Sequence, residues 1–420
     1  MYFIIRRLIV SGVFFFTAGF LLISCSGDNS LAGKPVNMNA GCRRDNNFIS
    51  YGTFTSSGTG YTDKIAATDT SGAIVRPLVM DIDKIAFATR GGSINVSLGT
   101  DTLWTAKMPE GSYVAAGMCA DKNQNLYAIT SNGIVLSYSP NGTFRWKFFF
   151  ADAGDTSLVL FSDLLALDDG IIAASSDGTA VRIDSSGRQI WKRGFTGSVL
   201  ASFPADEEDN VYIPVTFDTF GATDSIYCID KSGKTKWGVA LTNTRIVRVP
   251  VLDYDNIYIP CVEGAGDGKK PQIAALSKTG KPLWQAVLKF LPRFISIGSS
   301  GEIIVVSYDL PFGKPYSLFS CFDEKGKQKW VNSVDLAIRT PVMISKNSYS
   351  FVGVRDNTAA VFYYRREDDV VLYSDFQIPD FPALDLTPVV LPGAVLAFAG
   401  SDEYLIYRID NTKLEKLFPW

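Results

Sequence analysis

Histidine is absent from this chain of 420 residues. Its absence excludes Ser-His and Cys-His nucleophilic devices, zinc held by histidine, and haem attached through a Cys-x-x-Cys-His motif. Basic and acidic residues are nearly balanced, 40 against 43, so the formal charge is −3. The chain therefore lacks the basic footprint of a nucleic-acid-binding domain, and we expect no nucleic-acid partner.

Long apolar runs are also scarce, and the one at the start of the chain is short. Arg6 and Arg7 precede an apolar stretch over residues 8–21, which ends in Leu-Ile-Ser-Cys at 22–25. A transmembrane anchor is the alternative, but a bilayer span needs about 20 apolar residues. The pattern resembles the signal peptide and lipobox of bacterial lipoproteins. That resemblance implies cleavage before Cys25 and attachment of diacylglycerol and palmitate to this cysteine.

The residue after the cysteine bears on location. Ser26 stands where an aspartate would retain a lipoprotein at the inner membrane under the familiar sorting rule, so we expect the outer membrane, facing the periplasm. The following polar residues suit a flexible tether. We predict a signal peptide over 1–24, the lipidated Cys25 with a tether over 25–70, and a folded body over 71–420.

Tryptophan recurs at a nearly constant interval through the body of the chain. Six of the seven tryptophans follow one another at spacings of 42, 45, 46, 47 and 46 residues. Five of them close an eight-residue phrase such as DKSGKTKW (230–237), which places a glycine four residues before the tryptophan. A fixed period of this length indicates one structural unit that is stacked or circularised. The tryptophans are Trp104, Trp146, Trp191, Trp237, Trp284 and Trp330, and the glycines are Gly142, Gly187, Gly233, Gly280 and Gly326.

Each repeat contains four short β-rich runs separated by turn residues. In one unit the runs cover 199–205, 210–217, 225–230 and 234–241. Short strands at even spacing predict all-β structure, and the period selects a propeller of four-stranded blades. We call the strands A to D, from the central channel to the rim. The glycine supplies the positive φ of the C-to-D turn, and the tryptophan follows in strand D.

The phrase, written small-x-Asp-x-x-Gly-x-x-x-Trp, resembles the PQQ-type propeller repeat of quinoprotein dehydrogenases and of BamB, the propeller lipoprotein of the β-barrel assembly machine. A small residue precedes the Asp or Ser by two places in four units, at Ser137, Cys228, Ala275 and Cys321, whereas Arg182 breaks the pattern. Two weaker units, ending at Tyr373 and near Leu417, bring the predicted number of blades to eight, with seven as the alternative.

Quinone chemistry is not implied by the repeat itself. Quinoprotein dehydrogenases carry an adjacent Cys-Cys disulfide, which this chain lacks, and their calcium ligands and catalytic aspartate have no recognisable counterpart. Acidic stretches at 121–125, 206–210 and 253–256 suggest calcium, but hairpin turns explain their Asp and Asn. We expect no catalytic residue, no metal and no cofactor.

The other cysteines do not fit a disulfide framework in the predicted ring. Cys228 and Cys321 occupy equivalent places two blades apart, and Cys119 and Cys261 lie three blades apart, well beyond the ~6 Å between Cα atoms that a disulfide spans. We expect these four to be small core residues and Cys42 to be the most reactive.

The B-to-C connection is longer in three consecutive units, at 218–224, 263–272 and 308–316. In a propeller these connections emerge on the same face as the D-to-A connections, so they would crowd one sector, where recognition concentrates. Length drift without function is the alternative. The candidate partner-binding residues are Phe217, Phe220, Lys269, Lys270, Tyr308, Phe312 and Tyr316.

Together these patterns predict a non-catalytic lipoprotein that binds protein partners in the bacterial envelope, with BamB-like scaffolding of outer-membrane assembly as the leading version. The alternatives are a propeller that binds carbohydrate or another extracellular ligand and, less favoured, a PQQ-dependent dehydrogenase.

Overall fold

The computed structural model describes most of the repeat region and short segments on either side of it. The described residues are 36–37, 64–66, 75, 78–81, 84–89, 91–98, 101–150, 160–199, 202–217, 223–264, 268–298, 301–309, 316–338, 342–345, 348–355, 358–367, 370–377, 389–390, 395–399 and 404–408.

The described strands form eight antiparallel sheets, which we number in order along the chain. Sheet 1 contains β3 (Leu78–Asp81), β4 (Lys84–Ala88), β5 (Ser93–Leu98) and β6 (Asp101–Lys107). Sheet 2 contains β7 (Cys119–Ala120), β8 (Leu126–Ile129), β9 (Ile134–Tyr138) and β10 (Phe144–Phe149), with β1 (Val36–Asn37) added beside β7. Sheet 3 contains β11 (Leu165–Leu167), β12 (Gly170–Ala174), β13 (Thr179–Ile183) and β14 (Gln189–Gly194).

Sheets 4 to 6 carry the three longer connections. Sheet 4 contains β15 (Val211–Val215), β16 (Ser225–Ile229) and β17 (Thr235–Ala240), and isolated bridges supply its innermost segment. Sheet 5 contains β18 (Thr244–Ile246), β19 (Val251–Leu252), β20 (Asn256–Glu263), β21 (Lys270–Ser277) and β22 (Pro282–Val287). Sheet 6 contains β23 (Pro292–Ile297), β24 (Ile303–Asp309), β25 (Tyr316–Phe322) and β26 (Gln328–Val334).

The last two sheets have no tryptophan phrase. Sheet 7 contains β27 (Ala337–Ile338), β28 (Met343–Ser345), β29 (Ser348–Arg355), β30 (Thr358–Glu367) and β31 (Val370–Gln377). Sheet 8 contains β32 (Val389–Val390), β33 (Val395–Ala399), β34 (Tyr404–Arg408) and β2 (Lys64–Ala66).

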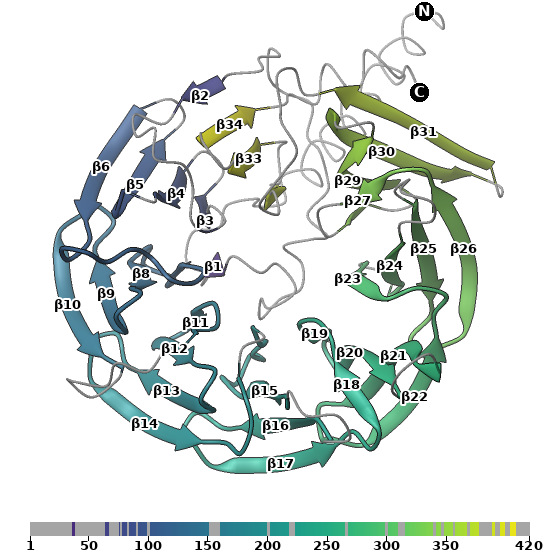
Figure 1. Cartoon of the computed structure of the whole chain (residues 1–420), viewed down its shortest axis with the longest axis horizontal. Helices are drawn as coiled ribbons and strands as arrows, with labels where there is room; N and C mark the ends of the chain where they lie inside the picture. Colours follow the sequence, from purple (N-terminus) through teal and green to yellow (C-terminus); the bar gives the residue numbers. More distant parts are fainter. Residues whose placement is uncertain are drawn as a thin grey trace, which may run out of the picture.

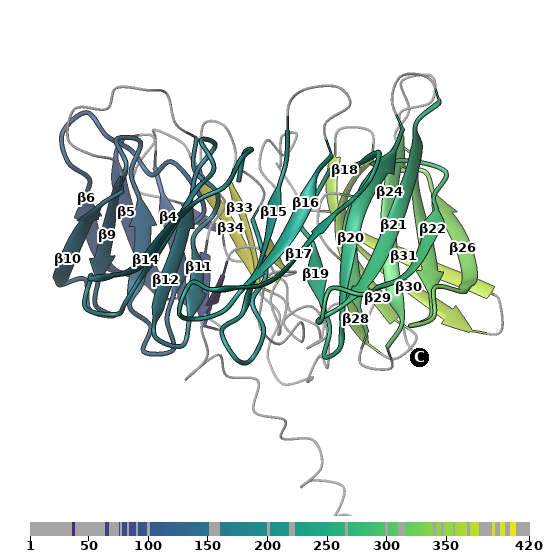
Figure 2. The same cartoon turned by 90° about the horizontal axis from the view of Figure 1, so that it is seen from below.

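These sheets are arranged around a central axis, with β6, β10, β14, β17, β22 and β26 on the rim (Figure 1). The strands run between two faces of the ring (Figure 2). The face that carries the B-to-C and D-to-A connections is called the loop face below, and the opposite one the turn face. The architecture is the predicted all-β propeller; the number of blades, eight or seven, stays a prediction.

The predicted tryptophans join neighbouring sheets. Each ring in the first five units lies over the turn glycine of the next sheet, and a Cβ atom added at Gly280 would lie 2.7 Å from the ring of Trp237. Four indole N–H groups also donate to the carbonyl two residues before that glycine, at 2.8–3.0 Å; the acceptors are Pro140, Ser185, Lys278 and Glu324. The small residue of the phrase lies directly opposite the tryptophan on strand C, as in the pair Cys228 and Trp237.

Arg182 changes this contact between sheets 3 and 4. It stands opposite Trp191 in place of a small residue, and its guanidinium donates to the carbonyl of Lys231 at 2.9 Å. That carbonyl occupies the position that accepts the indole N–H in the other units. The Trp191 indole nitrogen is accordingly buried without a hydrogen-bond partner, while Arg182 pairs with Asp209 at 3.3 Å.

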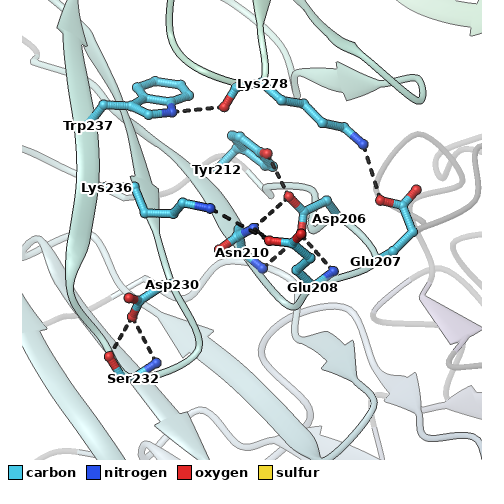
Figure 3. Close-up of polar contacts among 10 residues, drawn as sticks. All are labelled: Asp206, Glu207, Glu208, Asn210, Tyr212, Asp230, Ser232, Lys236, Trp237 and Lys278. Carbon is cyan, nitrogen blue, oxygen red and sulfur yellow. Dashed lines mark hydrogen bonds and ion pairs between the residues drawn. The ribbon is translucent and has the colours of Figure 1, made fainter.

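The acidic stretches are turns, as predicted. Asp206 accepts hydrogen bonds from the backbone of Glu208 and Asn210, from the Asn210 amide and from the Tyr212 hydroxyl (Figure 3). The Tyr212 ring then packs against Trp237, with centroids 5.9 Å apart. The carboxylate therefore orients its own turn and, through a tyrosine, the tryptophan contact. Asp121 and Asp253 make the same bond to Tyr127 and Tyr258.

Four cysteines, Cys119, Cys228, Cys261 and Cys321, are buried free thiols, in agreement with the prediction. Burial raises the pKa of Cys228 and of Cys261 to about 12, which keeps both as unreactive thiols at neutral pH. Cys42 lies outside the described residues.

Sheet 8 shows how the ring closes, which the sequence left open. Its D strand was expected within its own unit, near Leu417, whereas the structure pairs β34 with β2 from the start of the chain, Ile65 opposite Ile406. Pairing between the two ends of the chain has no signature in the repeat. β1 and β2 both lie in the segment predicted to be a tether, so five of its residues are paired with the propeller.

Among the described residues, none belongs to a helix long and apolar enough to cross a bilayer. The predicted signal peptide and Cys25 lie outside them.

Candidate protein-binding surface

Two of the three long connections, those of sheets 5 and 6, are shorter than their sequence suggested, whereas all of 218–224 lies between β15 and β16. β20 and β21 remain paired as far as Glu263 and Lys270, and β24 and β25 as far as Asp309 and Tyr316. Lys270, Tyr308 and Tyr316 were predicted to lie in loops, and this was wrong: they lie on strands. The strands extend because the cross-strand pairs continue beyond the level at which the other units turn.

The loop connections of sheets 4 and 5 contact each other. Arg245, in the A strand of sheet 5, donates to the carbonyl of Phe217 at 2.8 Å. Gly264, just after β20, donates to the carbonyl of Asn243 at 2.9 Å. The B-to-C and D-to-A connections therefore share one face, as predicted, and are held together by backbone acceptors.

The candidate residues near sheet 4 are partly engaged by the fold. Phe217 is half-buried, its backbone N–H donates to the carboxylate of buried Asp224, and its ring lies against Gly197. Lys269 and Lys270 are exposed. Phe220 and Phe312 lie outside the described residues.

Tyr308 and Tyr316 each contact residues that the sequence did not single out. The Arg293 guanidinium lies over the ring of Tyr308, 5.0 Å from its centroid, and Phe290 meets Tyr316 edge to face at 6.0 Å. Lys289 lies 5.2 Å from the Phe290 centroid. Tyr308 is paired with Ser317, so Tyr308 and Tyr316 lie on opposite faces of the sheet. We call Arg248, Arg293 and Tyr308 the sheet 5–6 cluster.

Arg248 joins this cluster through its charge. Partial burial and the nearby positive charge of Arg293 lower the pKa of Arg248. The rest of the side chain is accessible to solvent, and one guanidinium nitrogen donates to the carbonyl of Val247. Arg248 lies between β18 and β19, and Arg293 lies in β23, the innermost strand of the next sheet (Figure 1).

This arrangement favours binding over chemistry. Aromatic rings and arginines are the side chains enriched in protein interfaces. Among the described residues, no group of three or more acidic, cysteine or histidine side chains is placed to hold a metal ion. Arg248, Lys289, Phe290 and Arg293 were not predicted, because they lie in D-to-A and A-strand segments that carry no recurring motif.

Comparison with known proteins identifies the repeat. Residues 176–378 match the family model described as outer membrane protein assembly factor BamB. They form a PQQ-type, BamB-like repeat. The match runs from the B-to-C connection of sheet 3 to the end of β31. It thus includes the three long B-to-C connections at 218–224, 263–272 and 308–316, which we call the loop sector. No curated protein matches the sequence significantly.

Solved structures resemble the whole propeller. BamB from Moraxella catarrhalis aligns over 84% of this chain and 100% of its own, with 16% identity and a TM-score of 0.55. The WD40 domain of SCAP from fission yeast aligns over 83% and 98%, with 9% identity and a TM-score of 0.54. The C-terminal WD40 domain of Sif2 aligns over 84% and 99%, with 10% identity and a TM-score of 0.58. At these identities the likeness concerns the fold, and it confirms the predicted propeller.

Proposed function

We propose that this chain is a non-catalytic lipoprotein scaffold that binds other envelope proteins through its loop face and takes part in outer-membrane protein assembly. The observation that carries the proposal is the match of residues 176–378 to the BamB family model. The loop sector and the sheet 5–6 cluster lie within that range, and their composition is that of a protein interface.

The partner is tested by crosslinking the full-length, membrane-bound protein in native envelopes and identifying what is recovered with it. We expect components of the outer-membrane assembly machinery. A matched variant lacks residues 218–222 and carries Asn-Gly in place of 310–315, a two-residue turn that leaves the strand pairs Val215–Ser225 and Asp309–Tyr316 able to form. Equal recovery with this variant would show that the partner binds elsewhere; recovery of no assembly component from the wild type would refute the proposed role.

The lipid anchor is a separate part of the proposal. Its support is the Leu-Ile-Ser-Cys sequence at 22–25. Cys25→Ala is expected to abolish labelling with radioactive palmitate and to release the protein from membranes, because one thioether carries the diacylglycerol. Cys228→Ala is the control, since this buried thiol lies in the propeller. Unchanged labelling of Cys25→Ala would refute the anchor.

A further inference from the structure

We propose that the sheet 5–6 cluster is a carboxylate-binding site that takes an acidic, extended segment of a protein partner, with Arg248 and Arg293 as its two ligating groups. This inference rests on the proposed function, since it names the chemistry of the partner segment that the loop face would bind.

The first support is the way the backbone presents both arginines. Between the pairs Ile246–Cys261 and Val251–Tyr258, the inner strand of sheet 5 advances five residues while β20 advances three. Arg248 lies in this two-residue excess. Insertions of this kind bend a strand, redirect a side chain and are over-represented beside functional sites.

Sheet 6, the next sheet along the ring, also has an arginine at an interruption of its inner strand. Pro292 pairs with Ser307 and Phe294 with Val306, so Arg293 is the extra residue of a bulge. Two neighbouring inner strands thus interrupt their ladders, and each places an arginine at the interruption. A bulge changes the direction in which the side chain of its extra residue points.

The second support is electrostatic. The two guanidiniums are close enough for one to disfavour the charge of the other, and among the ion pairs of the described residues neither arginine takes part. Like charges held together by a rigid fold are relieved when an anion binds between them. Guanidinium groups bind carboxylates through paired, charge-assisted hydrogen bonds.

The third support distinguishes a peptide from an anionic membrane. Tyr308 lies beneath the Arg293 guanidinium and offers apolar surface next to the charged groups, where a side chain of an extended segment can pack. The chain as a whole is acidic, with a formal charge of −3, whereas adsorption to anionic lipid needs a broad basic surface. A small cationic patch on an acidic protein selects a local acidic ligand.

The test uses the full-length protein in detergent and two capped decapeptides, one of alternating glutamate and leucine and one with glutamine in place of glutamate. Calorimetric titration is expected to show binding of the glutamate peptide only. Arg248→Gln combined with Arg293→Gln should weaken it by more than about tenfold, because two charge-assisted contacts are lost. An unchanged thermal midpoint shows that the double variant is folded.

The matched control removes two charges elsewhere. Lys281→Gln with Lys327→Gln changes exposed lysines in C-to-D turns on the turn face and should leave the affinity unchanged. Equal binding of the glutamate peptide to the arginine variant, or equal binding of both peptides to the wild type, would overturn the inference. So would arginine-dependent binding to phosphatidylglycerol vesicles without peptide binding.

The same variant separates this inference from the proposed function. Arginine-dependent peptide binding together with no assembly protein in the crosslinking experiment would support the carboxylate site and refute the scaffold role. Recovery of assembly proteins, together with a peptide affinity that is unchanged in the arginine variant, would support the scaffold role and refute the carboxylate site.

Discussion

At the scale of single residues, the turn glycines have two reasons to be glycine. Gly280 has a φ of +82°, which residues with a Cβ adopt only with strain, and it lies beneath the ring of Trp237. The sequence predicted the turn from the spacing. It did not predict that the same residue forms the floor for the preceding unit's tryptophan, since that contact crosses between sheets.

Gly280→Ala is therefore expected to lower the free energy of unfolding by about 1–3 kcal/mol, and by more if the ring is displaced. Urea unfolding followed by tryptophan fluorescence measures this. Gly194→Ala is the control, because its φ is not positive and no atom lies within 4 Å of the added methyl group. Equal losses for the two variants would contradict the role of the Trp237 contact.

Arg182 shows how one residue changes a repeated contact, the hydrogen bond from a tryptophan indole to a turn carbonyl of the next sheet. The sequence marked it as an exception, and the structure shows the consequence, a buried ion pair with Asp209 and an indole N–H of Trp191 without a partner. Side-chain exposures of 4% for Arg182 and 11% for Asp209 mean that losing either partner leaves a charge away from water.

Arg182→Met is expected to destabilise the protein by about 3 kcal/mol, because it leaves Asp209 without its cation. Adding Asp209→Asn should recover part of this loss, since asparagine removes the charge and tolerates the φ of +63° at this position. A double-mutant cycle from urea unfolding gives the coupling. Strictly additive losses would show that the pair is not coupled.

At the scale of elements, the turns hold strands in register through their first residue. Asp184 begins the C-to-D turn of sheet 3 and accepts hydrogen bonds from Ser186 and Arg188. Burial raises the pKa of Asp184, but these hydrogen bonds outweigh it and lower the pKa to about 2. The sequence predicted that Asp or Ser would bond its own turn, and here the structure gives the bonds.

Because the pKa of Asp184 in the folded protein lies below its ordinary value of 3.8, the contribution of Asp184 to stability is complete above about pH 4 and is lost as the pH falls towards 2. We expect Asp184 to contribute about 1 kcal/mol to the free energy of unfolding, because solvent near the turn screens its interactions. Urea unfolding of wild type and Asp184→Asn between pH 2 and 6 should differ at pH 6 and converge near pH 2. A constant difference would contradict the assignment.

The strands of the loop sector were predicted less well than those elsewhere. Gly, Lys and Pro in 263–272 and 308–316 read as loops, but cross-strand pairing carries β20, β21, β24 and β25 into both stretches. A pattern of local turn residues cannot show that two strands continue to pair. It also cannot show the interruptions at Arg248 and Arg293, which depend on the register of the neighbouring strand.

At the scale of the whole molecule, the ring closes through its first segment. β2 is the outer strand of sheet 8 and pairs with β34, so residues 64–66 and 404–408 join opposite ends of the chain. Tyr373 and Leu417 marked the end of the tryptophan series. The rim strand of the last sheet comes from residues more than 300 positions earlier in the chain. A repeat period cannot indicate such a pairing.

This closure predicts an engineered disulfide. Ile65→Cys with Ile406→Cys places two cysteines directly opposite each other, within the Cα separation that a disulfide spans, so oxidation should join the chain ends. A non-reducing peptide map detects the bridge, and the oxidised form should melt at a higher temperature. Ile65→Cys with Tyr404→Cys is the control with the wrong register. Bridging in the control alone would place β2 elsewhere.

β1 extends sheet 2 inward in the same way. Val36 pairs with Ala120 and Asn37 with Cys119, and β1 also contacts β3 and β11 of the neighbouring sheets. β1 lies near the centre of the ring (Figure 1). The segment between the predicted lipid site and the propeller therefore contacts the inner strands of three sheets.

By itself the sequence determined the unit, four strands with a turn glycine and a rim tryptophan, because each unit makes its hydrogen bonds between neighbouring strands of one short stretch. It also determined the buried cysteines and the role of the acidic turns. Only the tertiary structure decided how sheet 8 is completed, that Arg182 binds the carbonyl which accepts an indole N–H in other units, and that Arg248 and Arg293 lie at interruptions of neighbouring inner strands. These contacts join segments from different units, and their geometry depends on register and on the packing of one sheet against the next.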